Sequence, residues 1–520
     1  MKLRAKIVDL EAAGKPIAIL NKNDARLLRV APLERVSIVY DNREIIALID
    51  VTDTFVSEGE IGLFESIIET LKVKDNDIVD VHPAPKPVSI SYIKRKMLRE
   101  HSLTREQFFE LMNDINLNRL SDTEIAVFIS SVAINGLTDN EILDLIDALV
   151  NTGEQLNLSD IKNVVTKHSI GGIPGNRVTL LILPIVTAAG LIMPKLSTRA
   201  ITSPSGTADT AEIFMPIDLT IDEFRKIILK VGGALASNER LGICPAMSKL
   251  IRILSPLALD PEPLLISSIL AHMKALSAKH VVIDIPTGRG AKVYRLAKAQ
   301  ELGEKMVSIG MRAGVSLECV ITPGDRPIGK FIGPALEAYD VLRILTTGKG
   351  SFDLKNKALS LAGILLEVTN IAEYGKGVKV AEEILESGKA WKKMMEIIEI
   401  QGGDPKVSLD DIPLGTYTAE YYAPMDGTVY GFDNRTIREI AKVAGAPIDK
   451  GAGVVLLVDK GDDVKKGQLL MKIYSNSEAR LTQALKVAER RNPYIFEKMI
   501  LGRITPDKVH IEDESIFGES

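Results

Sequence analysis

The spacing of apolar residues changes three times along this 520-residue chain. In residues 1–85, apolar and polar positions alternate in short runs such as KLRAKIVDL and EIIALIDV, with Gly, Asn and Asp between them. A period of two is typical of strands that bury one face. These residues therefore predict a small β-barrel-like N-terminal domain, for which we expect a role in oligomerisation or partner binding.

Residues 90–155 follow a helical period instead. The runs FFELMNDI, SDTEIAVFISSVAI and TDNEILDLIDALV place apolar residues at i, i+3, i+4 and i+7. Each run begins behind Ser, Thr or Asp with an acidic residue close by, which suits an N-cap and the helix dipole. This segment predicts a helical domain.

Strand and helix patterns alternate in residues 156–405. The β-branched run HVVIDI (280–285) is followed by a helical pattern from Ala291 to Gly314 and by a second strand, SLECVIT (316–322). This order predicts a parallel βαβ unit in a central α/β domain with a mixed or parallel sheet. The uncharged run Val178 to Pro194 contains Pro and Gly and is shorter than the roughly 20 residues of a membrane span, so it predicts a buried helix.

Residues 415–520 become rich in strand patterns again. APMDGTVYGFD and GVVLLVDKGDDVKKGQLLMKIYS flank the helical run TIREIAKVAG. The two flanking runs resemble biotinyl and lipoyl carrier domains, but the modifiable Lys of their exposed hairpin has no counterpart between these halves. We therefore expect a structural α+β domain of the barrel-sandwich kind, which completes a multidomain α/β protein.

Composition narrows the classes of function. Lys and Arg (64) nearly balance Asp and Glu (69), for a net charge of −5, which disfavours a general nucleic-acid binder. Two cysteines and six histidines offer neither a disulfide framework nor metal-ligand spacing. The N-terminus lacks the apolar core of a signal peptide. We expect a cytoplasmic protein without a metal, a membrane partner or a nucleic-acid partner.

Candidate chemistry gathers in two loops on either side of the apolar run. In the first loop, Lys167, His168 and Ser169 precede Gly171, Gly172 and Gly175. A loop of this composition before a helix presents backbone N–H groups and the positive end of the helix dipole to an anion. It has neither the GK[ST] of a Walker A loop nor the GxGxxG pattern. Taken alone, a plain glycine turn explains it equally well.

The second loop follows the apolar run and surrounds Arg199 with hydroxyl groups. Its six hydroxyl residues are Ser197, Thr198, Thr202, Ser203, Ser205 and Thr207. Hydroxyls around one guanidinium suit a phosphate or a sugar. A solvated loop that caps the next helix is the alternative, but two such loops beside one buried helix together favour an anion-binding site.

These loops carry a family resemblance. KHSIGGIPGNR and STRAITSPSGTADT resemble the signature loops of the thymidine/pyrimidine-nucleoside phosphorylases, and most closely those of the archaeal AMP phosphorylase branch. The long, type-2 thymidine phosphorylases are the second relative, and the resemblance extends over most of the chain. It implies phosphorolysis, in which inorganic phosphate attacks C1′ of AMP, and possibly of CMP or UMP, to give the base and ribose 1,5-bisphosphate. Phosphate is then a co-substrate, and the resemblance implies no cofactor and a homo-oligomer.

The resemblance also assigns residues. Phosphate-binding positions match Lys167, Ser169, Ser197 and Thr207. Nucleotide-binding positions match Gly172, Thr198, Arg199, Ala200, Ile201, Thr202, Ser203, Thr207, Ser268 and Lys292. Lys292 comes at the end of the 280–285 strand, where ligands collect in α/β sheets. As an isolated residue it would be interpreted as a solvated helix lysine.

Asp260 matches the proton donor of the AMP branch. An Asp before Pro is usually a turn or N-cap residue, and composition alone favours that interpretation. A general acid at neutral pH has to keep its proton, which requires a desolvated site. We therefore expect Asp260 to be the catalytic residue that protonates the departing base.

One departure concerns the base. Short thymidine phosphorylases hold the pyrimidine with an Arg and a Lys, whereas this chain has Ile253 and His272 at those places. Their loss disfavours strict thymine specificity and leaves the choice among adenine, cytosine and uracil open. Two alternatives to a nucleotide phosphorylase remain: a type-2 thymidine phosphorylase that acts on nucleosides, and a non-catalytic nucleotide-binding or assembly protein.

Overall fold

The computed structural model describes the chain apart from residues 13, 201–202, 258, 498–501, 505–508 and 512–520. It divides into two compact units. The first holds Met1–Gly153 together with Cys244–Ala271, and the second holds Glu154–Ile243 together with His272–Ser520. The segment Cys244–Ala271 thus belongs to the first unit. The four domain boundaries expected from the sequence stay predictions. In the described part of the chain, no helix has the length and apolar character needed to cross a membrane.

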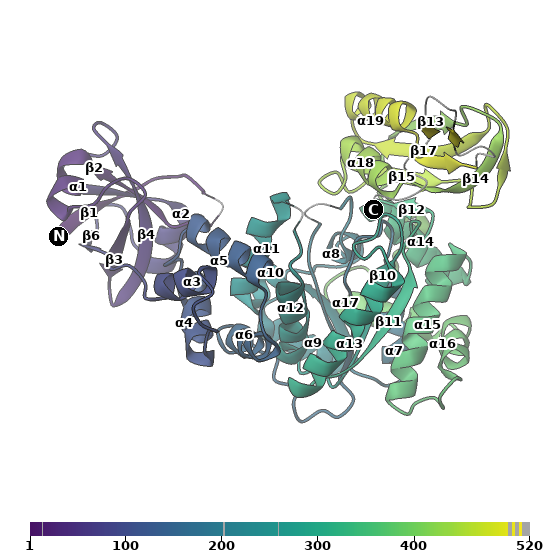
Figure 1. Ribbon diagram of the computed structural model, residues 1–520, viewed down its shortest axis with the longest axis horizontal. Helices are drawn as coiled ribbons and strands as arrows, with labels where there is room; N and C mark the ends of the chain where they lie inside the picture. Colours follow the sequence, from purple (N-terminus) through teal and green to yellow (C-terminus); the bar gives the residue numbers. More distant parts are fainter. Residues whose placement is uncertain (13, 201–202, 258, 498–501, 505–508, 512–520) are drawn as a thin grey trace. The chain divides into compact units, whose positions relative to one another are not determined.

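The first unit begins with a closed barrel whose strand order is β1-β5-β2-β4-β3-β6 (Figure 1). Its strands are β1 (Lys2–Ile7), β2 (Ile17–Asn21), β3 (Arg35–Tyr40), β4 (Arg43–Thr52), β5 (Glu60–Leu63) and β6 (Ile78–Pro83), with helices α1 (Lys22–Leu28) and α2 (Glu65–Leu71) between strands. The apolar residues of the alternating runs point inward, and Leu20, Ile38 and Ile61 are fully buried. The polar residues between them face outward, as a period of two requires.

Helices follow the barrel in the same unit. They are α3 (Ser89–Met97), α4 (Arg105–Asn116), α5 (Asp122–Asn135), α6 (Asp139–Asn151), α11 (Pro245–Leu254), the 3₁₀ turn η1 (Ser255–Leu257) and the first part of α12 (Glu262–Ala275). Three of them begin with a capping box, at Thr104, Ser121 and Thr138. Lys249 of α11 donates hydrogen bonds to the carbonyls of Ile115 and Asn116 at 2.7 and 2.9 Å, and so attaches the returning segment to the end of α4.

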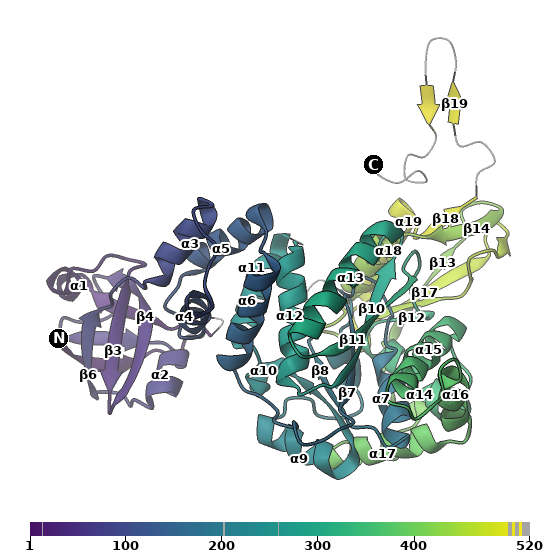
Figure 2. The same cartoon turned by 60° about the horizontal axis from the view of Figure 1, so that its bottom comes forward.

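The second unit is built on parallel strands. They are β7 (Val165–Ser169), β8 (Met193–Ser197), β9 (Gly233–Ser237), β10 (His280–Thr287) and β11 (Ser316–Pro323). β10 lies between β11 and β7 and is parallel to both, and α13 (Leu296–Arg312) connects β10 to β11 and packs against β11 (Figure 2). This is the predicted parallel βαβ unit, although its helix begins at Leu296 rather than at Ala291.

The sheet splits between β7 and β8. β8 pairs with β9, and the single bridge between Val164 and Ile192 joins this pair to β7. Beyond the bridge, side chains replace the ladder: Thr166 Oγ1 donates to the Pro194 carbonyl at 3.1 Å, and Lys195 Nζ donates to the Lys167 carbonyl at 3.0 Å. The chain leaves β7 toward β8 on one side, while β10 lies on the other side. The loop after β7 therefore lies at the switch point where α/β sheets bind ligands.

The apolar run forms two elements instead of one. Helix α7 (Thr179–Ala188) is buried along its length in the core of the second unit. Gly190, with a φ of 90°, then turns the chain into β8, so a helix through Pro194 was wrong. Further helices surround this core: α8 (Thr207–Ala211), α9 (Ile221–Val231), α10 (Asn238–Leu241), α14 (Pro334–Thr347), α15 (Phe352–Val368), α16 (Gly377–Glu386) and α17 (Lys389–Ile400).

In the described residues, the C-terminal part has three small sheets and two helices. Its elements are β13 (Tyr417–Tyr422), β14 (Gly427–Phe432), α18 (Asn434–Ala444), β15 (Gly453–Leu456), β16 (Asp463–Val464), β17 (Leu469–Ser475), α19 (Glu478–Arg491), β18 (Tyr494–Phe496), β19 (Gly502–Ile504) and β20 (Val509–Ile511). The short strand β12 (Phe331–Ile332) comes from the α/β part and pairs with β15, so one sheet spans both parts.

Candidate functional site

A cluster of buried charges lies at the carboxyl ends of β7 and β10. Ser169 and Asp284 are paired in register, and Asp284 is completely buried. The Asp284 carboxylate accepts hydrogen bonds from Ser169 (2.9 Å), Asn176 (3.1 Å) and Thr322 (2.6 Å). The two predicted phosphate-binding residues of the first loop, Lys167 and Ser169, thus belong to the strand end rather than to the loop.

Two buried ammonium groups approach the same carboxylate. Lys357 Nζ of α15 lies 2.9 Å from an Asp284 oxygen, and Lys167 Nζ lies 3.8 Å from it. Burial would raise the pKa of Asp284, but Lys167 and Lys357 lower it to about 2. Asp284 is therefore ionised at neutral pH, and it offsets part of the positive charge beneath the loop.

The cluster nevertheless keeps an excess of positive charge. Burial lowers the pKa of Lys167 to about 8, against the opposing effect of Asp284. Burial and the neighbouring charge of Lys167 lower the pKa of Lys195 to about 7. The pKa of His168 is lowered too, by burial first and then by Lys195 and His272. Buried cations that depress one another's pKa favour the binding of an anion, because an anion would stabilise their protonated forms.

The glycine-rich loop follows directly after β7. Gly172 has a φ of 95°, and a Cβ there would lie 2.9 Å from Cγ of Lys292, so only glycine lets the exposed Lys292 lie against this backbone. Lys292 itself lies in the loop before α13. Gly175, with a φ of 73°, approaches the Ile328 carbonyl in the same way. The structure thus brings Gly172 and Lys292 together, as the assignment of both to one ligand requires.

The two ends of the second loop, residues 198–200 and 203–206, are held by a buried carboxylate. Asp209 Oδ2 accepts hydrogen bonds from the backbone N–H groups of Ala200 (2.7 Å) and Gly206 (2.8 Å). A Cβ at Gly206 would lie 2.5 Å from the Thr198 carbonyl, so the two ends of the loop touch. Ser197 ends β8 and Thr207 begins α8. The loop therefore closes tightly between the two predicted phosphate-binding hydroxyls.

The guanidinium of Arg199 is surrounded by carboxylates. Its guanidinium donates to the carboxylates of Glu212, Asp218 (2.7 Å) and Glu239. These hydrogen bonds outweigh burial and raise the pKa of Arg199 further above its ordinary value. The interpretation of Arg199 as a guanidinium that recognises phosphate is therefore not supported, since protein carboxylates already occupy it. A role of Arg199 in a nucleotide site stays a prediction.

Arg177 connects the two loops. It follows the glycine-rich loop and donates to the Ser205 carbonyl, and it lies 3.5 Å from Thr207 Oγ1. Its other side is ion-paired with the buried Glu337 of α14, which also accepts a hydrogen bond from Thr210 at 2.8 Å. The loops after β7 and β8 are thus fixed to one another by a buried guanidinium.

The remaining predicted residues have different surroundings. Asp260 and Ser268 belong to the first unit, where Asp260 is exposed just before α12 and Ser268 is half-buried on that helix. Its own unit does not give Asp260 the desolvated surroundings expected of a general acid. Ser203 is half-buried, and its hydroxyl donates to the Ser205 carbonyl at 3.0 Å. Ile201 and Thr202 lie outside the described residues. The binding and catalytic roles stay predictions.

Sequence reasoning missed several residues of this region. Asp284, Lys195, Lys357 and Arg177 were not singled out, although the first two carried a signal. Each is a lone charged residue inside an apolar strand, in HVVIDIPT and MPKLS. An isolated charge in a buried strand is costly without a partner, so it marks a polar cluster.

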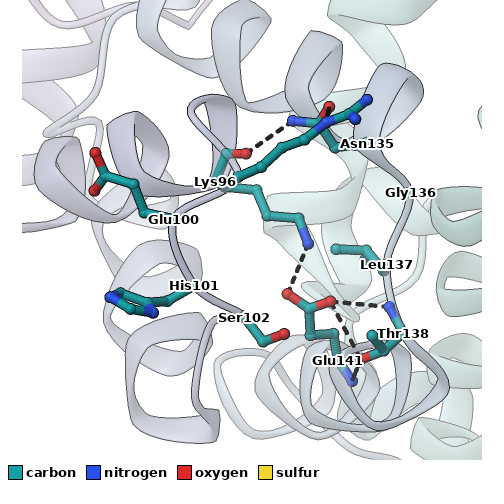
Figure 3. Close-up of a pocket in the computed structure, with 10 residues that line it drawn as sticks. Lys96, Glu100, His101, Ser102, Asn135, Gly136, Leu137, Thr138 and Glu141 are labelled. Carbon is teal, nitrogen blue, oxygen red and sulfur yellow. Dashed lines mark hydrogen bonds and ion pairs between the residues drawn. The ribbon is translucent and has the colours of Figure 1, made fainter.

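A separate cavity of about 710 Å³ lies among the helices of the first unit (Figure 3). At its centre, Lys96 and Glu141 form a buried ion pair at 2.7 Å. Glu141 also accepts hydrogen bonds from the backbone N–H groups of Leu103 (3.0 Å) and Thr138 (2.9 Å). Lys96, Glu141 and these backbone groups thus satisfy one another. Among the described residues, no cluster of His, Cys, Asp and Glu could hold a metal ion.

Comparison with known proteins covers nearly the whole chain. Residues 90–153 match the helical bundle domain and residues 161–391 the a/b domain of the glycosyl transferase family, and residues 428–494 match the pyrimidine nucleoside phosphorylase C-terminal domain. The chain resembles the solved anthranilate phosphoribosyltransferase (TrpD) of Thermus thermophilus with a TM-score of 0.50 at 17% identity. That match covers 59% of this chain and 98% of the other, and at this identity it speaks for the fold alone.

Full-length relatives are much more similar. A protein named AMP phosphorylase from Thermococcus kodakarensis is 42% identical over 504 residues, which is 97% of this chain and 99% of that protein. Proteins of the same name from Methanosarcina acetivorans and Pyrococcus furiosus are also 42% identical, and cover 97% and 96% of this chain and 99% of their own length. The chain belongs to the AMP phosphorylase branch of the pyrimidine-nucleoside phosphorylase family.

Proposed function

We propose that this chain is a pentosyltransferase that cleaves AMP with inorganic phosphate, to give adenine and ribose 1,5-bisphosphate. Relatives named AMP phosphorylase match it from end to end at 42% identity, which favours this activity over a type-2 thymidine phosphorylase. CMP and UMP are further candidate substrates. Ile253 and His272 stand where short thymidine phosphorylases hold the pyrimidine with an Arg and a Lys, which counts against strict thymine specificity and leaves the choice among adenine, cytosine and uracil open.

The observation that carries the proposal is the cationic cluster at the split between β7 and β8. Lys167 and Lys195 are buried with lowered pKa values, and Asp284 is the carboxylate that faces Lys167. Maintaining such charges costs free energy in the absence of an anion. Orthophosphate is an anion that would offset that cost, and the carboxyl ends of parallel strands are the place where such a ligand is expected.

In the proposed reaction, phosphate supplies the nucleophile and the chain supplies position. Lys167, Ser169, Ser197 and Thr207 bind orthophosphate, and one of its oxygens attacks C1′ of the ribose. The C1′–N bond breaks, and its electron pair leaves with the base. Asp260 gives its proton to the base, and the C1′–O bond to phosphate completes ribose 1,5-bisphosphate. Holding both reactants in one geometry is a major part of such catalysis.

The nucleotide is assigned to the second loop and to Lys292. Gly172 and the segment Thr198–Ser203 contact AMP in this proposal, with Ser268 as an additional contact. The tight contact between Gly172 and Lys292 supports placing both at one ligand. Lys292 then offers a positive charge to the 5′-phosphate or a hydrogen bond to the ribose.

The test is product identification with the purified full-length chain. AMP plus phosphate should yield adenine and ribose 1,5-bisphosphate, and omission of phosphate should abolish adenine release. Asp260→Asn should lower kcat by at least about a hundredfold, as expected on loss of a general acid. No base release from AMP, CMP or UMP would refute the proposal.

Parallel reactions separate the alternatives. Release of thymine from thymidine, without release of any base from a monophosphate, would favour the type-2 thymidine phosphorylase. Tight AMP binding with no turnover in either the wild type or the Asp260 variant would favour a non-catalytic nucleotide-binding protein. Activity that survives exhaustive treatment with a chelator would support the prediction that no metal cofactor is needed. Assembly into homo-oligomers and cytoplasmic location stay predictions.

A further inference from the structure

A lysine of the C-terminal part reaches the helix that follows the loop assigned to the nucleotide. Lys450 follows α18, and its Nζ lies 2.9 Å from Asp209 Oδ1 and 2.9 Å from Glu212 Oε2. Asp209 is almost completely buried, and Lys450 and Glu212 are partly exposed. One ammonium group thus bridges two carboxylates on and beside α8.

Each of these carboxylates also accepts hydrogen bonds from residues of the second loop. The other oxygen of Asp209 accepts the N–H groups of Ala200 and Gly206, and the other oxygen of Glu212 accepts the guanidinium of Arg199. Both ends of the loop are therefore fixed by the two carboxylates that Lys450 holds. Without the ammonium group, the two carboxylates would repel each other and would be free to rotate away from the loop.

The backbone around Lys450 is itself held firmly. The Lys450 carbonyl accepts a hydrogen bond from the Ala335 N–H at 2.9 Å, at the start of α14. Two residues further on, the Ala452 carbonyl lies so close to Gly333 that a Cβ at Gly333 would be 2.3 Å from it. β15 begins at the next residue, Gly453, and its Val454 and Val455 pair with β12. The backbone of Lys450 is therefore fixed against the start of α14 and the beginning of β15.

A second cation from the same part reaches the other loop. Arg438 of α18 donates from Nη1 to the Gly172 carbonyl at 3.2 Å, at the glycine that lies against Lys292. The C-terminal part thus contacts the first loop through Arg438 and, through Lys450, the two carboxylates that hold the second loop.

We propose that Lys450 is a positioning residue for the nucleotide: through Asp209 and Glu212 it aligns the two ends of the second loop, at Arg199, Ala200 and Gly206, without touching the substrate. This inference rests on the proposed function, because it takes that loop as part of the AMP site. It gives the C-terminal domain a role in substrate binding.

The test compares Lys450→Met and Lys450→Arg with the wild type as full-length proteins. Lys450→Met should raise the KM for AMP by about tenfold or more and change kcat by less than about threefold, because loop alignment is lost while the phosphate cluster stays intact. Lys450→Arg keeps the charge and should restore the KM to within about threefold of wild type.

Lys330→Met is the matched control. Lys330 pairs with Asp459 at 2.6 Å and so also joins the α/β part to the C-terminal part, but Asp459 holds neither end of the second loop, whereas Asp209 and Glu212 do. Its KM for AMP should equal that of the wild type. An equal rise of the KM in Lys330→Met and Lys450→Met would show a general effect of domain attachment and would overturn the proposal.

Hydrogen exchange gives a readout that does not need turnover. Lys450→Met should accelerate exchange at the N–H groups of Ala200 and Gly206, and leave exchange in β15 and β17 unchanged. If the wild type does not cleave AMP, the proposed function fails, and the exchange rates still decide whether Lys450 holds the loop. Unchanged exchange at both amides, or an unchanged KM in an active enzyme, would refute the positioning role.

Discussion

Replacing Asp284 by Asn should destabilise the α/β domain strongly. The side chain keeps its size but loses the charge that faces Lys167 and Lys357. It also exchanges one acceptor oxygen for a donor in a cluster where Ser169, Asn176 and Thr322 already donate. The variant therefore leaves two buried ammonium groups and at least one buried donor without their acceptor.

The magnitude follows from two contributions. The pKa of Asp284 is lowered from 3.8 to about 2 by Lys167 and Lys357, which overcome the opposing effect of burial. This difference corresponds to about 2 kcal/mol of stability that is present above pH ~4 and is lost as the pH falls toward ~2. Leaving buried partners unpaired adds to it, so the total at pH 7 should be about 3–5 kcal/mol.

The single tryptophan provides the assay. Trp391 lies on α17 against the core of the second unit, so its fluorescence reports unfolding of this domain. With a urea m-value of about 2–3 kcal/mol/M, the midpoint for Asp284→Asn should fall by about 1–2 M at pH 7. The difference from wild type should shrink as the pH is lowered from 4 toward 2, because the wild-type carboxylate becomes protonated.

A surface pair of the same domain is the control for this measurement. Glu386 is largely exposed and pairs with Lys355 at 3.9 Å, so Glu386→Gln should cost less than about 1 kcal/mol. If Asp284→Asn shifts the midpoint no more than Glu386→Gln does, the stability of the buried cluster does not depend on its carboxylate. A difference that stays constant down to pH 2 would show that ionisation is not its cause.

Three further predictions address other parts of the chain. The pKa of Lys195 falls from 10.5 to about 7 on folding, so between pH 7 and 10.5 Lys195 is protonated in the unfolded chain but not in the folded chain, and the free energy of unfolding rises with pH. Lys195→Met should reduce this rise by up to about 1.4 kcal/mol per pH unit. An unchanged pH slope in urea unfolding would contradict this. Glu141→Gln should lower the free energy of unfolding of the first unit by about 3 kcal/mol, because Lys96 loses its buried partner. Hydrogen exchange at the backbone N–H groups of α6 should become faster, and unchanged exchange rates there would contradict this. Gly206→Ala should raise the KM for AMP about tenfold, since its Cβ would press on the Thr198 carbonyl, and steady-state kinetics with a normal KM would rule this out.

The sequence predicted those parts of the fold whose signals are local. The three helical runs of residues 90–155 start at Thr104, Ser121 and Thr138, because a capping box requires only residues three positions apart. The βαβ unit of β10 and β11 was predicted equally well from β-branched runs around one helical pattern. β7 was missed because VTKHS has buried polar residues where a strand pattern expects apolar ones.

The sequence predicted the two loops of the candidate site but not the residues that hold them. The two loops could be found because glycine and hydroxyl residues are concentrated in short segments. What fixes the loops is distant in sequence: Ser169 and Asp284 are 115 residues apart, and Asp209 and Lys450 are 241 apart. No periodicity links such pairs, since strand register and domain packing bring them together. A lone charge in an apolar strand, such as Lys195, does reveal that a partner is needed, because burying it unpaired costs free energy. It does not reveal the partner, which for Lys195 is the backbone carbonyl of Lys167 and, in the proposed function, the phosphate that enters beside it.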